Sequence, residues 1–317
     1  MMQAPGFWQR DGLLARALSP AGEIVAQVAE RRMAQLGWRA PVPVICCGNA
    51  TVGGTGKTTV ALDLARRLAG RDIAVHCLSR GYGGRVRGPW RVQVGRDNTS
   101  AVGDEPLLLA EIAPTWVGRD RAASARAAVA AGAAALVMDD GLQHAGLVQD
   151  LAFLVVDGVV GFGNGRVLPA GPLRERLEAA AGRCRAAIVI GPDACAAALP
   201  HTLKVLRAEL VAEGEFAGQR VLAFAGIGRP LKLGETLAAQ GAEVLGVRSF
   251  PDHHVYRPAE LDRVLAEAAR LGAAAVTTRK DAMRLPAAYR ARVAVAGIRI
   301  AWENEAALDA VIREVLP

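Results

Sequence analysis

A glycine-rich segment near the N-terminus carries residues suited to binding phosphate. It ends in a Gly-Lys-Thr-Thr sequence at residues 56–59, follows an apolar run over residues 42–48 and precedes a helical pattern over residues 60–68. In this strand–loop–helix order, backbone N–H groups and the helix N-terminus contact phosphate oxygens, and Lys57 reaches the β/γ-phosphates. The hydroxyl of Thr58 would bind Mg²⁺. We therefore predict a nucleotide-binding loop made of Thr51, Val52, Gly53, Gly54, Thr55, Gly56, Lys57, Thr58 and Thr59.

One position departs from the common pattern of such loops, which has glycine where this chain has Thr51. Gly53 and Gly54 can supply the flexibility instead. The competing interpretation is a glycine-rich turn with a solvated lysine. We disfavour it because strand and helix patterns flank the segment in the required order.

Two aspartates follow the apolar run at residues 133–138, which is typical of a buried strand. An acid at the tip of such a strand beside a phosphate loop is the usual partner of Mg²⁺, so Asp139 and Asp140 are predicted metal ligands. His144 lies close behind, but a lone histidine there is more often structural than catalytic.

Several loops after predicted strands carry arginines or polar residues that can contact a substrate, because ligands lie at the carboxyl ends of parallel strands. Residues 161–175 contain too much glycine and proline for regular structure and are interpreted as a functional loop. Arg85 is interpreted as solvated. The expected substrate contacts are Arg80, Arg121, Asn164 and Arg174.

Asp104 and Glu105 precede Pro106 at the start of a helix predicted over residues 107–112. One of them can serve as a helix N-cap, which needs no chemistry. Alternatively, adjacent acids at the ligand edge of a sheet can accept a proton from a substrate hydroxyl. The residues themselves leave both interpretations open.

Length and composition indicate a globular protein of two domains, with 317 residues and 52% apolar residues. The net charge of +7 favours an acidic partner but does not distinguish nucleic acid, an anionic membrane or a phosphorylated substrate. Five cysteines without a C-x-x-C pair indicate reduced residues of a cytoplasmic protein. No signal peptide and no apolar run long enough to cross a bilayer are evident.

Strand and helix patterns alternate through the chain, which predicts a doubly wound, mostly parallel α/β sheet. We divide the chain into an N-terminal amphipathic segment (1–36), a nucleotide-binding domain (37–213) and a smaller C-terminal α/β domain (214–317). Ser19 before Pro20 predicts two short N-terminal helices with a break between them. Phe7, Trp8 and the arginines behind them suit a membrane interface. Packing of this segment on the next domain is the alternative, and it is slightly favoured.

Taken together, these loops resemble the tetraacyldisaccharide 4′-kinase family of the lipid A pathway over nearly the whole chain. In that family the first loop position carries threonine, which accounts for Thr51. The resemblance rests on the aromatic N-terminus and on eight ordered motifs at residues 48–58, 79–83, 103–106, 139–144, 168–175, 224–230, 252–254 and 279–282.

The resemblance implies an ATP- and Mg²⁺-dependent enzyme on the cytoplasmic face of the bacterial inner membrane. Its acceptor would be tetraacyldisaccharide 1-phosphate, with an anionic membrane surface as a further partner and no nucleic acid; the oligomeric state stays open. The resemblance further implies that Asp104 is the catalytic base, paired with His253 across the two domains, although His254 is adjacent. It also adds Glu175 to the acids of the metal site.

Phosphoryl transfer depends on positioning and charge neutralisation, which Lys57, Mg²⁺ and the arginines would supply. The alternative function is a switch or chaperone ATPase or GTPase, since residues 278–281 loosely imitate the guanine-reading [NT]-[KR]-x-D motif. Their position far beyond the nucleotide-binding segment argues against it.

Overall fold

The protein is described by a computed structural model covering residues 5–192, 198–228, 230–252 and 254–316. The strands in these ranges form one sheet of 12 in the order β10-β9-β11-β12-β8-β7-β6-β1-β5-β2-β4-β3. The pairs β3/β4 and β8/β12 are antiparallel, and the other neighbouring strands are parallel. The predicted α/β fold with a mostly parallel sheet is therefore confirmed.

The first unit of the sheet surrounds β1, whose residues are all buried. Apolar residues on both faces of a strand indicate a central position with a layer of helices on each side. The strands of this unit are β1 (Val44–Gly48), β2 (Val75–Ser79), β3 (Trp90–Arg91), β4 (Thr115–Val117), β5 (Ala135–Asp139), β6 (Leu151–Asp157), β7 (Ala186–Ile190) and β8 (Lys204–Glu213).

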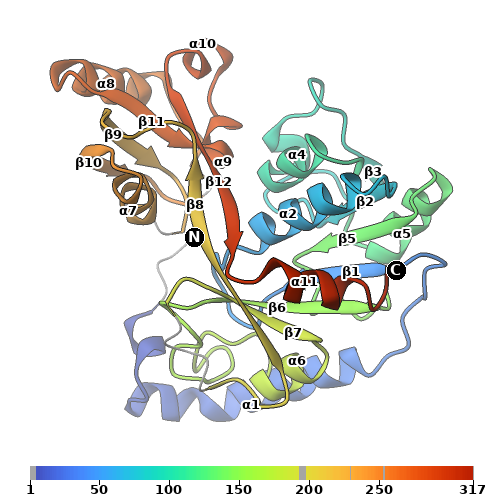
Figure 1. Ribbon diagram of the computed structural model, residues 1–317. Helices are drawn as coiled ribbons and strands as arrows, with labels where there is room; N and C mark the ends of the chain where they lie inside the picture. Colours follow the sequence, from blue (N-terminus) through green and yellow to red (C-terminus); the bar gives the residue numbers. More distant parts are fainter. Residues whose placement is uncertain (1–4, 193–197, 229, 253, 317) are drawn as a thin grey trace.

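Helices cover both faces of this unit (Figure 1). One face packs against α2 (Lys57–Ala69), α4 (Asp104–Ala110) and α11 (Glu305–Ile312) in a single apolar cluster. The other packs against α1 (Leu13–Met33), α5 (Arg121–Ala130) and α6 (Leu177–Gly182). A short helix, α3 (Thr99–Val102), precedes α4. The two layers hold the loops at the carboxyl ends of β1 and β5 in place.

The second unit is a smaller α/β layer at the other end of the sheet. Its core lies on the two faces of β9 and β11, under α7 on one side and α8 on the other. Its elements are β9 (Arg220–Ala225), α7 (Leu231–Ala239), β10 (Glu243–Ser249), α8 (Pro258–Arg270), β11 (Ala274–Thr278), α9 (Arg279–Ala282), α10 (Ala287–Arg290) and β12 (Ala294–Trp302).

The chain returns to the first unit at its C-terminal end. β12 pairs with the long strand β8, and α11 then buries Leu308, Val311 and Ile312 against α2 and its neighbours. Residues 305–312 therefore pack with the nucleotide-binding unit, although the division made from the sequence placed them in the C-terminal domain. The division itself stays a prediction.

The N-terminal segment differs from its prediction. A 3₁₀ turn, η1 (Gly6–Gln9), precedes one continuous helix, α1, which has Pro20 inside it; the predicted break between two helices was wrong. Proline inside a helix costs about 3 kcal/mol, so tertiary contacts must offset it. Arg176 forms ion pairs with Glu23 and Glu30 of this helix, and Gly22 packs so closely that a Cβ would lie 2.8 Å from the backbone oxygen of Val167.

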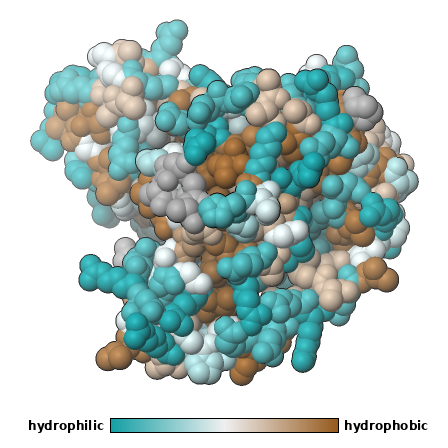
Figure 2. Space-filling model, turned by 60° about the horizontal axis from the view of Figure 1, so that its bottom comes forward, coloured by the Kyte–Doolittle hydropathy of each residue, from teal (hydrophilic) through white to brown (hydrophobic). Residues whose placement is uncertain are grey.

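Packing on the next domain, one of the two alternatives for this segment, is seen in α1, and contact with a membrane stays a prediction. Its small residues Ala15, Gly22 and Ala26 are buried against the first unit. Its large apolar residues are exposed, namely Leu13, Leu14, Ile24, Val25 and Val28, with Leu36 just beyond. In Figure 2, with the bottom of the molecule turned forward, separate hydrophobic residues stand among hydrophilic ones at the lower edge. No helix within the described ranges is both long and apolar enough to cross a bilayer.

Candidate active site

The phosphate loop connects β1 to α2, as the sequence predicts. Gly56 caps the helix with a φ of 90°, and Gly53 has a φ of 115°, so both adopt the left-handed region that favours glycine. The start of the loop is clamped by the segment that follows β6, since the Val52 N–H donates to the Pro172 oxygen at 2.9 Å. The free backbone N–H groups of α2 therefore face the same space as Lys57.

Thr58 and Asp139 meet beneath the loop. The Thr58 hydroxyl donates to Oδ2 of Asp139 at 3.0 Å, while Oδ1 of Asp139 is buried and has no hydrogen-bond partner. Burial, together with the carboxylates of Glu105 and Asp140, raises the pKa of Asp139 to about 7. A cation would offset this crowding of negative charge, so the hydroxyl–carboxylate pair fits Mg²⁺.

No cluster of three or more His, Cys, Asp or Glu side chains suited to a metal is found in the described ranges. Mg²⁺ does not need one, because it commonly takes one or two protein ligands and completes its shell with phosphate oxygens and water.

Asp140 lies between two cations of the loop region. Its Oδ1 is 3.5 Å from Lys57 Nζ and 3.0 Å from Arg174 Nη1, and its backbone has a φ of 51°. Burial alone would raise its pKa, but Lys57 and Arg174 lower it below the ordinary value. Asp140 is thus a fixed negative charge that orients Lys57. Asp139 differs from it, because the pKa of Asp139 is raised and that of Asp140 is lowered.

Glu175, the remaining acid of the predicted metal set, is fully buried. Both of its oxygens accept from Arg183 Nη2 at 2.7 Å, and Oε1 also accepts from Gln143 at 2.9 Å. Gln143 in turn accepts from Arg174. Glu175 is therefore connected to Asp140 by hydrogen bonds through Gln143 and Arg174. Its role as a direct metal ligand stays a prediction.

The predicted substrate arginines Arg80 and Arg121 lie near each other and near His144. Arg121 is buried, donates to the Gly118 oxygen and keeps Nε without a partner; burial lowers its pKa to about 10. Burial and the positive charge of Arg121 and Arg80 lower the pKa of His144, whose Nε2 is buried and also makes no hydrogen bond. Buried donors without partners are costly, so these groups are suited to an anionic ligand.

Asn164 forms hydrogen bonds with the N-terminal segment. Its side-chain amide donates to the backbone oxygens of Phe7 and Ala170, and its backbone N–H donates to the Trp8 oxygen at 2.7 Å. Trp8 also donates through Nε1 to the Pro169 oxygen at 3.0 Å. The functional loop thus holds the aromatic N-terminus, and the substrate contact predicted for Asn164 stays a prediction.

A cavity of about 480 Å³ opens between the two units, directly over the phosphate loop. The first unit contributes the loop, Glu105, Asp140 and Arg174 to its walls; the second contributes residues that include Asp252 and Lys280. Leu62, Leu210, Ile298 and Leu233 add an apolar part. A site with phosphate-binding groups at one end and apolar side chains at the other suits a nucleotide.

Glu105 contributes to the opposite wall, and the buried Asp104 lies beside it, with cations of the second unit next to both. Neither acid is the N-cap of α4, which is Gly103, so that interpretation was wrong. Asp104 Oδ2 accepts from Nε and Nη2 of Arg284, and Lys280 Nζ lies 3.1 Å from Glu105 and 3.7 Å from Asp104. Burial would lower the pKa of Lys280, but Glu105 and Asp104 raise it above its ordinary value.

His253, the predicted partner of Asp104, lies outside the described residues. The adjacent His254 contacts Glu260 through Nε2 at 2.9 Å and stacks on Phe250 with ring centroids 4.9 Å apart. These contacts give His254 a place in the packing of the second unit. The pairing of a histidine with Asp104 stays a prediction.

Asp281, the acid of the sequence that imitates a guanine-reading motif, is fully buried. It accepts from the Gly226 N–H at 3.0 Å, the Tyr256 hydroxyl at 2.8 Å and the Thr278 hydroxyl at 2.6 Å. Because these contacts within its own unit occupy the Asp281 carboxylate, it is not available to bind a guanine base. The sequence at residues 278–281 therefore does not support a GTPase.

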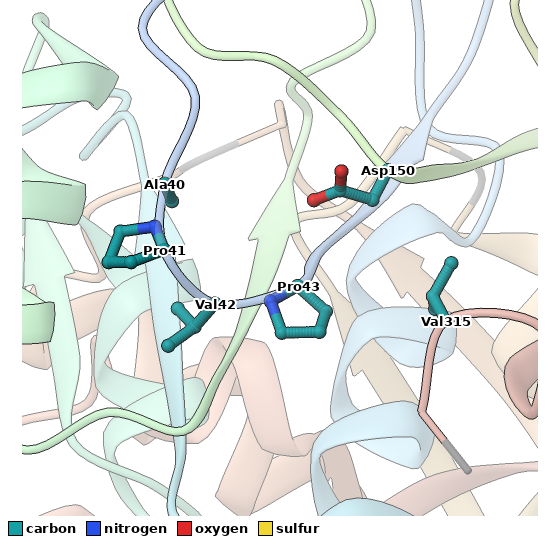
Figure 3. A pocket seen from close by; sticks show the side chains of 6 residues that line it. All are labelled: Ala40, Pro41, Val42, Pro43, Asp150 and Val315. Carbon is teal, nitrogen blue, oxygen red and sulfur yellow. The ribbon is translucent and has the colours of Figure 1, made fainter.

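A shallower pocket of about 300 Å³ lies at the amino end of β1, away from the phosphate loop (Figure 3). It is lined by Ala40, Pro41, Val42, Pro43, Asp150 and Val315. The carboxylate of Asp150 accepts from Arg39 and from the Val44 N–H. This pocket offers no catalytic group, and the chemistry belongs to the larger cavity.

A phosphate loop, a strand-tip aspartate beneath its threonine and a cavity closed by a second α/β unit define a P-loop nucleotide-binding protein of the phosphotransferase type. The family model described as tetraacyldisaccharide-1-P 4′-kinase matches residues 14–317. The chain belongs to the tetraacyldisaccharide-1-P 4′-kinase family, which confirms the resemblance drawn from its motifs.

Similar proteins match the sequence of this chain over nearly its full length. A tetraacyldisaccharide 4′-kinase of Gluconacetobacter diazotrophicus is 55% identical over 310 residues, covering 96% of this chain and 95% of that protein. One of Rhodospirillum centenum is 49% identical, covering 99% and 97%. The crystal structure of "apo" form LpxK from Aquifex aeolicus in complex with ATP has a TM-score of 0.74 and 24% identity, covering 96% of this chain and all of that one, and supports the fold.

The sequence singled out the loop and the strand-tip acids but missed Arg284. The signal was present in part, because Arg284 lies three residues after Asp281 and such a spacing places two side chains on one helical face. Nothing in the sequence pairs it with Asp104, from which it is separated by 180 residues.

Proposed function

We propose that the protein transfers the γ-phosphoryl group of ATP to the 4′-hydroxyl of tetraacyldisaccharide 1-phosphate, giving lipid IVA. The observation that carries the proposal is the cavity of about 480 Å³, which is lined by Lys57 and Thr58 on one wall and by Glu105, the neighbour of Asp104, on the other. Membership of the kinase family supplies the acceptor.

The phosphate loop would hold the nucleotide through the backbone N–H groups of residues 52–58, with Lys57 at the transferring phosphoryl group. Thr58 and Asp139 would hold Mg²⁺, assisted by Asp140. When bound, the ion neutralises charge on the phosphates. Asp140, which also pairs with Arg174, holds the Lys57 ammonium group within the cavity, since its Oδ1 lies 3.5 Å from Lys57 Nζ.

Asp104 would accept the proton of the acceptor hydroxyl, with His253 as its partner. Because the hydroxyl loses its proton late in a loose transition state, a well-placed carboxylate suffices as a base. Arg80, Arg121, Asn164 and Arg174 would contact the acceptor. The buried, unpaired donors of Arg121 and His144 support an anionic group on that side.

We also propose that α1 holds the enzyme on the cytoplasmic face of the bacterial inner membrane. The exposed apolar residues of α1 support this, since Leu13 is 87% and Ile24 is 64% exposed. Arg31 and Arg32 in its last turn would contact anionic headgroups. The small residues on the opposite side of the helix attach it to the first unit.

The test is a nucleotide panel with and without tetraacyldisaccharide 1-phosphate in detergent micelles. A kinase consumes ATP in proportion to phosphorylated lipid and needs both Mg²⁺ and the acceptor. Nucleotide hydrolysis that proceeds at the same rate without the acceptor, and no phosphorylated lipid, would instead identify a switch or chaperone NTPase.

A further inference from the structure

The ion pair between Arg284 and Asp104 joins the two units directly behind the cavity. Nε and Nη2 of Arg284 both donate to Oδ2 of Asp104, the first at 3.0 Å. Only 4% of the Arg284 side chain and 3% of the Asp104 side chain are exposed. A charge-assisted contact with two donors at this depth is stronger and more directional than a surface ion pair.

The other edge of the guanidinium group is fixed by the second unit. Nη1 donates to the Gly226 oxygen at 2.8 Å and to Oδ1 of Asp281 at 3.0 Å. Asp281 is itself held by the Tyr256 and Thr278 hydroxyls. Since a guanidinium group is planar and its donors have a fixed geometry, these partners define the position that the group presents to Asp104.

Lys280 contacts the same acids in a different way. It lines the cavity and lies closer to Glu105 than to Asp104, at 3.1 Å against 3.7 Å. An ammonium group acts as a point charge without a preferred plane. Among the described residues, neither Arg284 nor Asp104 lines the cavity, so Arg284 contacts Asp104 from behind the wall to which Glu105 contributes.

We propose that Arg284 is a positioning residue that fixes the orientation of the Asp104 carboxylate toward the acceptor hydroxyl. This inference rests on the proposed function. Oδ1 of Asp104 accepts from the Glu105 N–H of the first unit at 3.1 Å, whereas Oδ2 accepts from the guanidinium group of the second unit, so this second contact exists only while the units are together. Orientation of the carboxylate matters because phosphoryl transfer depends mainly on positioning.

The test is a double-mutant cycle on kcat with saturating ATP and lipid acceptor, using Arg284→Met, Asp104→Ala and the pair. Misplacement of a catalytic group by about 1 Å can cost ~10²-fold, so Arg284→Met should lower kcat by roughly this factor and leave the KM for ATP nearly unchanged. In the Asp104→Ala background the same substitution should cost nothing further. A loss of equal size in both backgrounds would overturn the inference, because the arginine would then act independently of Asp104.

Arg292→Ala is the matched control. This arginine also belongs to the second unit, but its ion pair with Asp262 is 3.9 Å long, more than half of each side chain is exposed, and it does not line the cavity. It should leave kcat within about twofold of the parent, as expected for a surface pair.

Arg284→Met leaves Asp281 with fewer partners, so the variant can fail to fold. If Arg284→Met does not fold, the test uses Arg284→Lys, which keeps the positive charge but loses the two-donor geometry. A kcat loss of roughly tenfold that disappears in the Asp104→Ala background supports positioning. Parental kcat in Arg284→Lys overturns it. Failure of the parent enzyme to phosphorylate the lipid would count against the proposed function instead.

Discussion

The two walls of the cavity are built in different ways. The phosphate-binding wall comes from one continuous stretch, β1 to α2, and from the tip of the adjacent strand β5. The opposite wall joins the start of α4 to the segment around α9, which comes from the other unit and lies 180 residues away in sequence. The first wall exists whenever the first unit is folded, whereas the second exists only where the two units meet.

This difference separates binding from catalysis. In the proposed function, groups of the first wall hold phosphate and metal in a fixed arrangement. Glu105 and Lys280 of the second wall, with Asp104 and Arg284 behind them, depend on the contact between units. Substitutions on the first wall should therefore affect nucleotide binding and turnover together, and substitutions on the second should affect turnover alone.

The largest effect is expected on the first wall. Lys57→Ala should lower turnover by roughly 10³-fold or more, because it removes the cation that the proposed function places at the transferring phosphoryl group. The measurement is kcat with lipid acceptor, together with circular dichroism to verify the fold. Lys204→Ala is the control, since that lysine is exposed and donates only to the Ala307 oxygen. Turnover near that of the parent would refute the assignment of the phosphate loop.

The second effect tests whether Asp104 and His253 act as a unit. Asp104→Ala should lower kcat by roughly 10²-fold or more, the scale of general base catalysis. The double variant with His253→Ala should cost little more than Asp104→Ala alone, because residues that act together are non-additive. Nucleotide affinity, measured by titration of a fluorescent ATP analogue, should be unchanged.

Additive losses in this cycle would show two independent groups. His254→Ala provides the comparison, since that histidine is engaged with Glu260 and Phe250. If it alone abolished turnover while His253→Ala was silent, the partner of Asp104 would have to be reassigned.

The third effect concerns the stability of the ligand-free protein, to which Asp139 of the first wall contributes. The pKa of Asp139 is raised to about 7 from its ordinary value of 3.8, chiefly by burial. Between these values the unfolded chain releases the proton while the folded protein keeps it, so this group makes the protein less stable as pH rises through that window. The melting temperature of Asp139→Asn should therefore exceed that of the parent at pH 8.

This advantage of Asp139→Asn should shrink toward pH 4 and should also diminish when Mg²⁺ and ATP are added to the parent. Thermal unfolding at several pH values measures both. A difference in melting temperature that is the same at pH 4 and pH 8 would show that Asp139 titrates at its ordinary value.

The smallest effect on turnover is expected at α1, which lies outside both walls. Replacing Leu13, Leu14 and Ile24 by glutamine should weaken co-sedimentation with anionic vesicles and leave ATP binding intact. Each basic residue near the surface contributes about 1 kcal/mol, so added salt should weaken binding as well. Vesicle binding unchanged by these substitutions would leave α1 with a packing role only.

The sequence predicted the phosphate-binding wall well because its signals are local. Glycines, a lysine and a threonine between a strand and a helix follow from the geometry of one loop. The apolar runs at residues 42–48 and 133–138 correspond to the strands β1 and β5, since such runs are short and bounded by turns, whereas β3 and β12 were not predicted. The N-terminal break was not correct, because Glu23, Glu30 and Gly22 make contacts that outweigh the local effect of Pro20.

The opposite wall could not be predicted from local pattern. Arg284 resembles any arginine after a helical turn, and Glu175 resembles an acid placed for a metal. The partners that decide their roles, Asp104 and Arg183, are set by tertiary packing. Family resemblance supplied Asp104, but it did not supply the guanidinium group that holds it.

The return of α11 to the first unit has a consequence for synthesis of the protein. Leu308, Val311 and Ile312 fill the same apolar cluster as α2, which carries the phosphate loop at its start. On the ribosome, the nucleotide-binding unit emerges early but lacks part of its core until translation ends. The second unit lies between these two parts in the sequence, so most of it is synthesised before α11. The unit that is synthesised first therefore completes its core last. A nascent chain that stops before residue 305 should expose an unfilled groove beside α2.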